Sequence, residues 1–181
     1  MGCFSINTGI TSACETSIGG LKEVILFNDD VKFTLSKDVE TNEVTGVSFT
    51  ESSITTGNTF LYAFKKGQAS MTTELQTGDT NYYTTNLMMN FSKLEATKRV
   101  AINALAKAQV RGVALDANGN AWLLGEENYL EATAMTAQTG QQRSDANNYS
   151  ITLTAESTYM PIAVNVETEY KKLEDVAKQP R

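Results

Sequence analysis

Acidic and amide side chains near the middle of the chain have the types and spacing of a calcium-binding loop. Asp116, Asn118 and Asn120 match the first three ligand positions of such a loop, and Glu127 falls at the twelfth. Ala121 stands where the loop needs glycine for its sharp turn, and the flanking segments have the pattern of strands rather than helices. We therefore expect a hairpin turn here, with no bound metal and no other cofactor.

Three neighbouring carboxylates, Glu126, Glu127 and Glu131, are the best candidates for acid–base catalysis. Adjacent acidic residues that follow a glycine are more often a solvated turn. The chain also contains no histidine, which removes the commonest general base at neutral pH and the commonest metal ligand. We expect a protein that is not an enzyme.

The elements around these residues have the pattern of short strands joined by hairpins. Asn118-Gly119 separates two apolar runs, which is the strongest short-range hairpin signal and predicts a type I′ turn. Ala69–Leu75 alternates apolar and polar residues, as a half-buried strand does, whereas Leu21–Phe27 is apolar almost throughout, as a strand covered on both faces would be. The predicted strands are Leu21–Phe27, Ala69–Leu75, Tyr82–Phe91, Val110–Asp116, Ala121–Leu124, Glu131–Ala137, Tyr149–Ala155 and Pro161–Val166.

One helix is predicted over residues 92–108, with Ser92 and Glu95 as a capping box at its start. We expect three parts in the chain: an N-terminal arm over residues 1–20, a β domain over residues 21–166, and a C-terminal tail over residues 167–181. Within the β domain, residues 36–59 are expected to form a protruding hairpin or a long loop.

The C-terminal tail is highly charged but keeps Tyr170, Leu173 and Val176 at helical spacing. This pattern fits a helix packed on its own domain, and it also fits an arm laid on a neighbouring subunit. We expect the arm, because termini are otherwise the parts of a domain that fray.

Composition favours a single, mainly β domain of acidic character. The 181 residues suit one domain, and the abundant threonine suits strand surfaces. The predicted fold is an antiparallel β-sandwich or open barrel with one flanking helix. A net charge of −6 argues against a dedicated nucleic-acid binder, although an acidic surface suits a channel wall that repels DNA. No segment approaches the length of a membrane span, and Cys3 and Cys14 are expected to be free thiols.

Four segments together resemble the tail tube proteins of tailed bacteriophages and prophages, of the type found in Bacteroidetes-like hosts. The similarity covers about residues 18–166 and consists of strand and turn signatures. The segments that carry it are Ile18–Val24, Phe64–Ser70, Leu115–Gly125, and the loop Thr139–Asp145 followed by Tyr149–Leu153.

The resemblance implies a virion structural protein, made in the host cytoplasm and located in the tail. The resemblance implies hexameric rings of such subunits that stack into a tube, through which the genome passes without specific binding. The expected partners are therefore further copies of the chain and other tail proteins, with no membrane. Residues proposed for contacts between subunits are Val39, Val44, Val47, Phe49, Tyr170, Leu173 and Val176, and those proposed to charge the lumen are Glu126, Glu127 and Glu131.

Other functions remain open at this point. A head–tail connector, a tail terminator or the inner tube of a contractile injection system would share the same physical features. A ligand-binding β-sandwich is a more distant alternative, and it would need an exposed aromatic cluster. Tyr82, Tyr83 and Tyr129 are the candidates for that cluster.

Overall fold

The computed structural model describes residues 9–10, 16–38 and 44–179. The fold is mainly β, with antiparallel sheets, as the sequence predicts. The elements in chain order are β1 (Leu21–Phe27), β2 (Phe33–Lys37), β3 (Val44–Phe49), the short 3₁₀ turn η1 (Glu51–Ser53), β4 (Thr59–Ala63), β5 (Ala69–Gln76), β6 (Tyr82–Ser92), α1 (Ala96–Leu105), β7 (Arg111–Asp116), β8 (Ala121–Leu124), β9 (Glu131–Gln138), β10 (Asn148–Ser157), β11 (Ile162–Val164), the π-turn η2 (Val166–Tyr170) and α2 (Lys171–Ala177).

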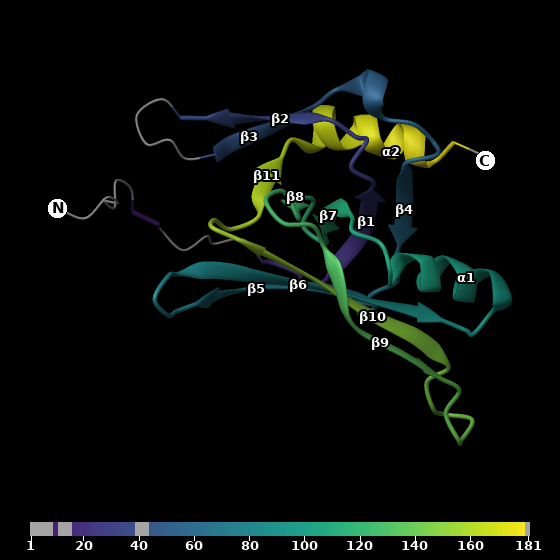
Figure 1. The fold of residues 1–181 in the computed structure, drawn as a ribbon. Helices are drawn as coiled ribbons and strands as arrows, with labels where there is room; N and C mark the ends of the chain where they lie inside the picture. Colours follow the sequence, from purple (N-terminus) through teal and green to yellow (C-terminus); the bar gives the residue numbers. More distant parts are fainter. Residues whose placement is uncertain (1–8, 11–15, 39–43, 180–181) are drawn as a thin grey trace.

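The strands form three layers (Figure 1). The middle layer is a five-stranded sheet in the order β11-β8-β7-β1-β4, and the layer on one side of it is a four-stranded sheet in the order β5-β6-β10-β9. The β2–β3 hairpin and α2 cover the other side of the middle sheet. We call the four-stranded layer the outer sheet.

Strand β1 shows why the middle sheet lies between two cores. Val24 and Leu26 pack into the cluster shared with the outer sheet and α1, whereas Ile25 and Phe27 pack into the cluster shared with β3 and α2. All four side chains are almost fully buried, because successive side chains of a strand point to opposite faces. The apolar run in the sequence therefore predicted both covered faces correctly.

The β7–β8 hairpin confirms the turn predicted at Asn118-Gly119, but the turn is not type I′. Gly119 has a φ of +91°, whereas Asn118 has a negative φ. The carboxylate of Asp116 accepts hydrogen bonds from the backbone N–H groups of Asn118 and Asn120, each at 2.8 Å. These two hydrogen bonds to the Asp116 side chain hold the backbone of the turn, and in this conformation Gly119 is the residue with a left-handed backbone.

The predicted capping box is wrong. Helix α1 begins at Ala96, and Ser92 is instead the last residue of β6, where its hydroxyl accepts a hydrogen bond from Gln68 Nε2 at 2.6 Å. Lys93, with a φ of +69°, then turns the chain away from the sheet. The tertiary pairing of β6 with β10 extends to Ser92 and overrides the local capping signal.

The segment around residues 36–59 begins as the β2–β3 hairpin and continues through η1 to the start of β4. Phe33 of β2 lies opposite Phe49 of β3, and the two rings meet edge to face with Phe27 from the middle sheet. Val39 lies outside the described residues.

The C-terminal tail packs on its own domain. Tyr170 and Leu173 are fully buried in the cluster formed by the middle sheet, β3 and β11. The Tyr170 hydroxyl also donates a hydrogen bond of 2.9 Å to the Glu23 carboxylate on β1. The tail is therefore part of the β domain in this structure, rather than an arm that leaves it.

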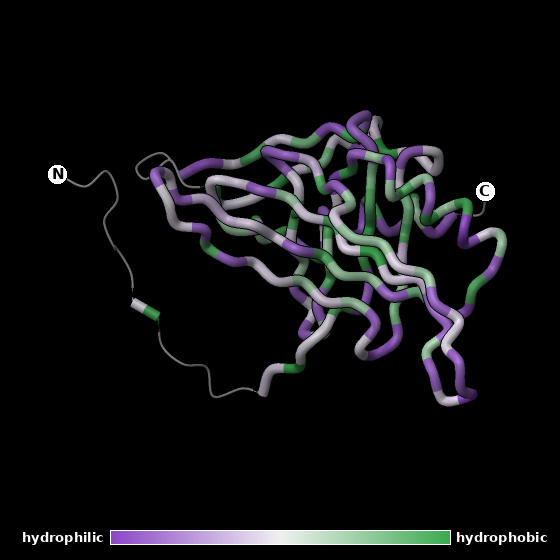
Figure 2. The backbone as a smooth tube through the Cα atoms, turned by 60° about the horizontal axis from the view of Figure 1, so that its bottom comes forward, coloured by the Kyte–Doolittle hydropathy of each residue, from purple (hydrophilic) through white to green (hydrophobic). Residues whose placement is uncertain are grey.

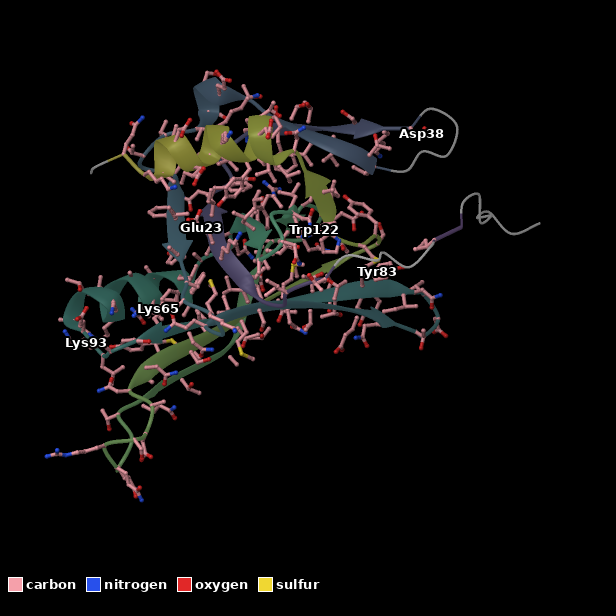
Figure 3. The ribbon with its side chains drawn as sticks, turned by 180° about the vertical axis from the view of Figure 1, so that it is seen from behind. Glu23, Asp38, Lys65, Tyr83, Lys93 and Trp122 are labelled. Atoms are coloured by element: carbon pink, nitrogen blue, oxygen red, sulfur yellow. The ribbon has the colours of Figure 1, made fainter. Side chains whose placement is uncertain are left out.

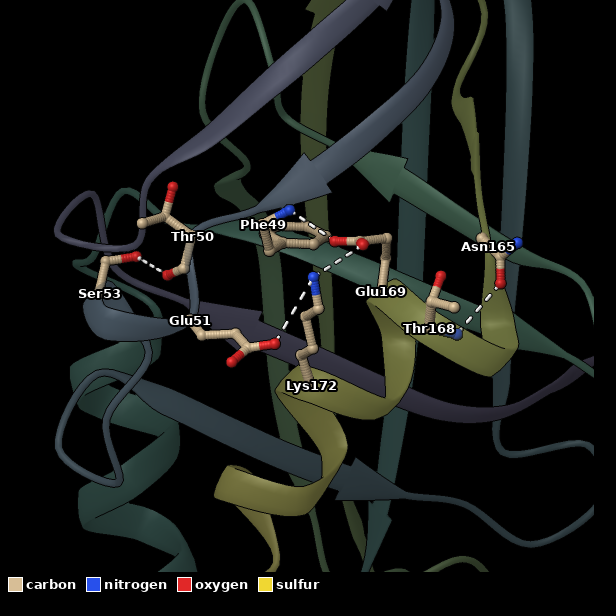
Figure 4. Close-up of polar contacts among 8 residues, drawn as sticks. All are labelled: Phe49, Thr50, Glu51, Ser53, Asn165, Thr168, Glu169 and Lys172. Carbon is tan, nitrogen blue, oxygen red and sulfur yellow. Dashed lines mark hydrogen bonds and ion pairs between the residues drawn. The ribbon is translucent and has the colours of Figure 1, made fainter.

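Glu169 fixes the tail to the end of β3 (Figure 4). Its carboxylate accepts a hydrogen bond from the Phe49 backbone N–H at 2.6 Å and one from Lys172 Nζ at 2.9 Å. Burial alone would raise the pKa of Glu169, but the hydrogen bonds from Lys172 and Phe49 outweigh it and hold the pKa below its ordinary value.

Replacing Glu169 with Ala should lower the free energy of unfolding by about 1–3 kcal/mol at neutral pH, because the Phe49 N–H loses its buried partner. A lowered pKa means that the ionised carboxylate stabilises the fold above the unfolded-state pKa, and that this contribution disappears as the pH falls through the folded-state pKa. Urea unfolding at pH 7 and at acidic pH would measure both effects. Glu167→Ala is the matched control, since Glu167 is exposed. Equal losses for the two variants would contradict the role of Glu169.

Candidate functional site: an uncovered acidic sheet face with two open edges

The outer sheet has one buried face and one uncovered face. Leu87, Met89, Ile151 and Leu153 point into the core, whereas the residues between them along β6 and β10 point away from it. In the part of the chain that the structure describes, neither a helix nor another sheet covers this second face (Figures 1 and 2). The residues of the uncovered face are Ser70, Thr72, Glu74, Gln76, Tyr82, Thr84, Asn86, Met88, Asn90, Glu131, Ala134, Thr136, Ser150, Thr152, Thr154 and Glu156.

Glutamates are the only charged residues in the four strands of this sheet. They are Glu74 on β5, Glu131 on β9 and Glu156 on β10, and none of the four strands contains Lys or Arg. Glu74 lies opposite Thr84, and Thr84 lies opposite Glu156, so that two carboxylates flank one threonine across three strands. Glu131 lies opposite Thr154 at the edge. The face therefore carries negative charge toward one end and mainly hydroxyl and amide groups elsewhere, with the exposed Met88 side chain among them.

Hydrogen bonds between side chains join the strands across this face. The Thr154 hydroxyl donates to Asn86 Oδ1 at 2.7 Å and lies 2.9 Å from the Thr133 hydroxyl. Thr133 is the extra residue of a bulge in the pairing of β9 with β10. Because such ladders link neighbouring strands, the polar face has a defined surface rather than a set of independent side chains.

Of the three carboxylates predicted to charge a lumen, only Glu131 belongs to this face. Glu127 instead binds the β10–β11 loop, where its carboxylate accepts hydrogen bonds from the Thr158 N–H and hydroxyl, both at 2.6 Å. Glu126 accepts a hydrogen bond from the Tyr159 hydroxyl in the same loop. These two glutamates therefore hold the connection between the two sheets.

The two loop-binding glutamates should respond oppositely to loss of charge. Burial, followed by the adjacent Glu127 charge, raises the pKa of Glu126, so ionised Glu126 lowers stability, and stability rises as the pH falls through its folded-state pKa. Glu126→Gln should leave the urea midpoint unchanged or raise it at pH 7.5. Glu127→Gln should lower it, because a neutral amide replaces the two charge-assisted hydrogen bonds to Thr158 with weaker neutral ones. A lower midpoint for Glu126→Gln at pH 7.5 would contradict this assignment.

Both edges of the outer sheet are open within the described residues. Strand β5 pairs only with β6, and β9 pairs only with β10. Both strands contain 8 residues and no proline, and each carries one charged residue. Nearly all of β9 is exposed, including Met135, which is 40% exposed. Long, unprotected edges of this kind are unusual in a protein that stays monomeric, because they pair readily with other strands.

The residues predicted for contacts between subunits lie mainly in the interior. Val47, Phe49, Tyr170 and Leu173 are buried, and Val44 and Val176 are half-buried against the same cluster. The packing seen here leaves Val47, Phe49, Tyr170 and Leu173 almost no exposed surface, whereas Val44 and Val176 stay partly exposed.

The candidate sites for other chemistry do not assemble. Within the described residues, no group of three or more Cys, Asp or Glu side chains is placed to hold a metal ion, and the carboxylate of Asp116 is used by its own turn. Tyr82 and Tyr83 lie on opposite faces of β6. The Tyr129 ring is covered by the Arg111 guanidinium, 4.4 Å from the ring centroid, so the three tyrosines do not form a common exposed platform.

Glu74 and Glu156 are the site residues that the sequence predictions missed. The sequence does indicate that both side chains are exposed, because each lies on the polar side of a strand in which apolar and polar residues clearly alternate. What the sequence does not show is which strands are neighbours. The pairing of β5 with β6 and of β6 with β10 is what places the two carboxylates together.

Comparison with protein-family models, curated proteins and solved structures finds no match. Among the described residues, no helix is both long enough and apolar enough to span a bilayer.

Proposed function

We propose that this chain is a structural subunit that assembles into rings, and that the rings stack into a tail tube of a bacteriophage or prophage virion. The observation that carries the proposal is the outer sheet, which combines an uncovered face free of basic residues with two open edges. The resemblance of residues 18–166 to tail tube proteins supports the same function.

The strand order makes the two edges complementary. Each neighbouring pair in the outer sheet is antiparallel, and the sheet has four strands, so β5 and β9 run in opposite directions. When identical copies are placed side by side in the same orientation, β9 of one copy meets β5 of the next as an antiparallel pair. When this head-to-tail contact repeats, the copies close into a ring if the rotation from one copy to the next is a whole-number fraction of 360°.

The uncovered face would then line one side of the ring. Its glutamates and hydroxyl groups provide no cation for the phosphates of DNA. Since affinity for nucleic acid comes mainly from Lys and Arg on phosphates, a wall of this composition would let DNA pass without holding it. Lys65 and Lys93 lie toward the α1 end of the molecule, and Tyr83 lies toward the other end (Figure 3).

Electron microscopy of the purified full-length protein, together with its mass by light scattering, tests the proposal. Rings or hollow tubes are the expected result. Rings that never stack would favour a connector or terminator role, and tubes that carry protein rather than DNA would favour a contractile injection system. A monodisperse monomer at high concentration would refute the proposal.

Assembly should become stronger as the salt concentration rises. Glu74 near one edge and Glu131 at the other carry like charges, and the pairing of the two edges brings them toward each other. Added salt shortens the Debye length from about 30 Å at 0.01 M to about 3 Å at 1 M and so screens this repulsion. The critical concentration, measured by sedimentation, should fall between these conditions. A rise in the critical concentration would show that attractive ion pairs dominate the interface.

A further inference from the structure

The open edges of the outer sheet are staggered. The last pair of β9 with β10 is Glu131 with Thr154, and β10 continues for three more residues without a β9 neighbour. On the other edge, β5 pairs with β6 as far as Gln76 with Tyr82. Thr72 of β5 pairs with Asn86, Asn86 pairs with Thr154, and Thr154 pairs with Glu131, so these four residues lie in one line across the sheet. The last four residues of β5 therefore extend beyond the residue at which β9 begins.

A hollow lies at the place where β9 has not yet begun. Its volume is about 440 Å³, and β10 lines it at Ala155 and Glu156, which we call its floor. We call it the β9 notch. Its other lining residues are Gln109, Asn128, Tyr129, Glu131, Thr133 and Thr154.

The walls of the notch are held in place by contacts within the chain. Arg111 stacks on the Tyr129 ring and forms an ion pair with Asp29. Asn128 Nδ2 donates a hydrogen bond of 3.0 Å to the Glu156 carbonyl oxygen, and Gln109 Nε2 donates one of 2.5 Å to the Glu131 carboxylate. The notch is therefore a preformed surface feature, which lowers the entropic cost of filling it.

The extension of β5 exposes an apolar side chain that has no role within the subunit. Leu75 belongs to the inner face of the outer sheet with Ala69 and Met71, but it is 51% exposed because the core does not extend to it. Ala155 of the notch floor belongs to the same inner face. When β9 of one copy pairs with β5 of the next, the β5 extension continues alongside the notch, with Leu75 on the side of Ala155.

We propose that the β9 notch is the docking site for the end of β5 of a second copy, with Leu75 as its apolar contact. This inference rests on the proposed head-to-tail assembly and specifies where its contact lies. Contact with the notch would bury Leu75 against Ala155 and Tyr129 and would set the axial alignment of neighbouring copies. Paired edges alone would allow the strands to slip by two residues without changing the faces of their side chains.

Cysteine cross-linking in assembled protein tests the docking. In a background with Cys3→Ser and Cys14→Ser, the double variant Leu75→Cys with Asn128→Cys should give a ladder of covalent oligomers with a short bismaleimide. Leu75→Cys with Val100→Cys is the control, because Val100 is 62% exposed on α1, away from the notch. The notch pair should give at least about tenfold more product, since groups held in contact react at a high effective concentration.

Electron microscopy of the same samples separates the two hypotheses. Rings or tubes with no ladder from the notch pair would overturn the docking site and leave the assembly proposal standing. A ladder without rings would support the docking site and count against a tube. The absence of both assembly and ladder would overturn both.

Discussion

Deletion of residues 170–181 is expected to unfold the domain, not merely to weaken its assembly. The deletion removes Tyr170 and Leu173, whose side chains are buried in the core with residue exposures of 1% and 0%. Loss of a buried Leu or a large aromatic side chain costs about 2–5 kcal/mol each. Since a domain of this size has a total stability of about 5–15 kcal/mol, the two losses together approach or exceed it.

Point variants measure the separate contributions of Leu173 and Tyr170 to stability, and they can be studied even if the deletion variant is not expressed. Leu173→Ala should lower the free energy of unfolding by about 3 kcal/mol, whereas Tyr170→Phe, which loses only the hydrogen bond to Glu23, should cost about 1 kcal/mol. Val100→Ala on α1 is the control, because an exposed apolar side chain contributes little to the core. Urea unfolding followed by circular dichroism measures all three. A deletion variant that keeps the native unfolding transition would show that the tail is dispensable for the fold.

The sequence predicted eight of the eleven described strands, because their signal is local; β4 was missed, and β2 and β3 were expected only as a hairpin or a long loop. Alternation in Ala69–Leu75 and the apolar run in Leu21–Phe27 each follow from the face or faces that the strand buries, and β5 and β1 begin at the predicted residues. The β7–β8 hairpin was likewise found from Asn118-Gly119. These features depend on residues close together in the chain, so tertiary structure does not have to be known.

The errors arose where contacts distant in sequence decide the outcome. The pattern of Tyr170 and Leu173 shows that one side of the tail helix is apolar, but it does not show whose core that side enters. The same limit applies to Glu126 and Glu127, because their partners, Tyr159 and Thr158, lie in a loop that follows β10. Glu131, which was proposed to charge a lumen, is an exposed acid of the outer sheet, whereas its two companions on that face, Glu74 and Glu156, were not proposed, because strand order was unknown.

A charge placed on the β9 edge should abolish assembly while leaving the fold intact. Met135→Lys is the variant of choice, because Met135 faces the core side of the sheet at its very edge and is 40% exposed. The long lysine side chain can reach solvent in the free subunit. In an assembly the β5 strand of the next copy would cover it, and natural sheets use inward-pointing charges of this kind to prevent edge pairing.

Val100→Lys provides the matched control, since it adds the same charge at an exposed position on α1. Met135→Lys should remain a folded monomer by light scattering and circular dichroism at concentrations where the Val100→Lys variant forms rings or tubes. The effect should be large, because every contact in a closed ring contains one β9 edge, so a single substitution weakens all of them at once. Assembly of Met135→Lys at the same concentration as the control would show that β9 is not the interface, and the head-to-tail arrangement would then have to use the edges of the middle sheet at β4 and β11 instead.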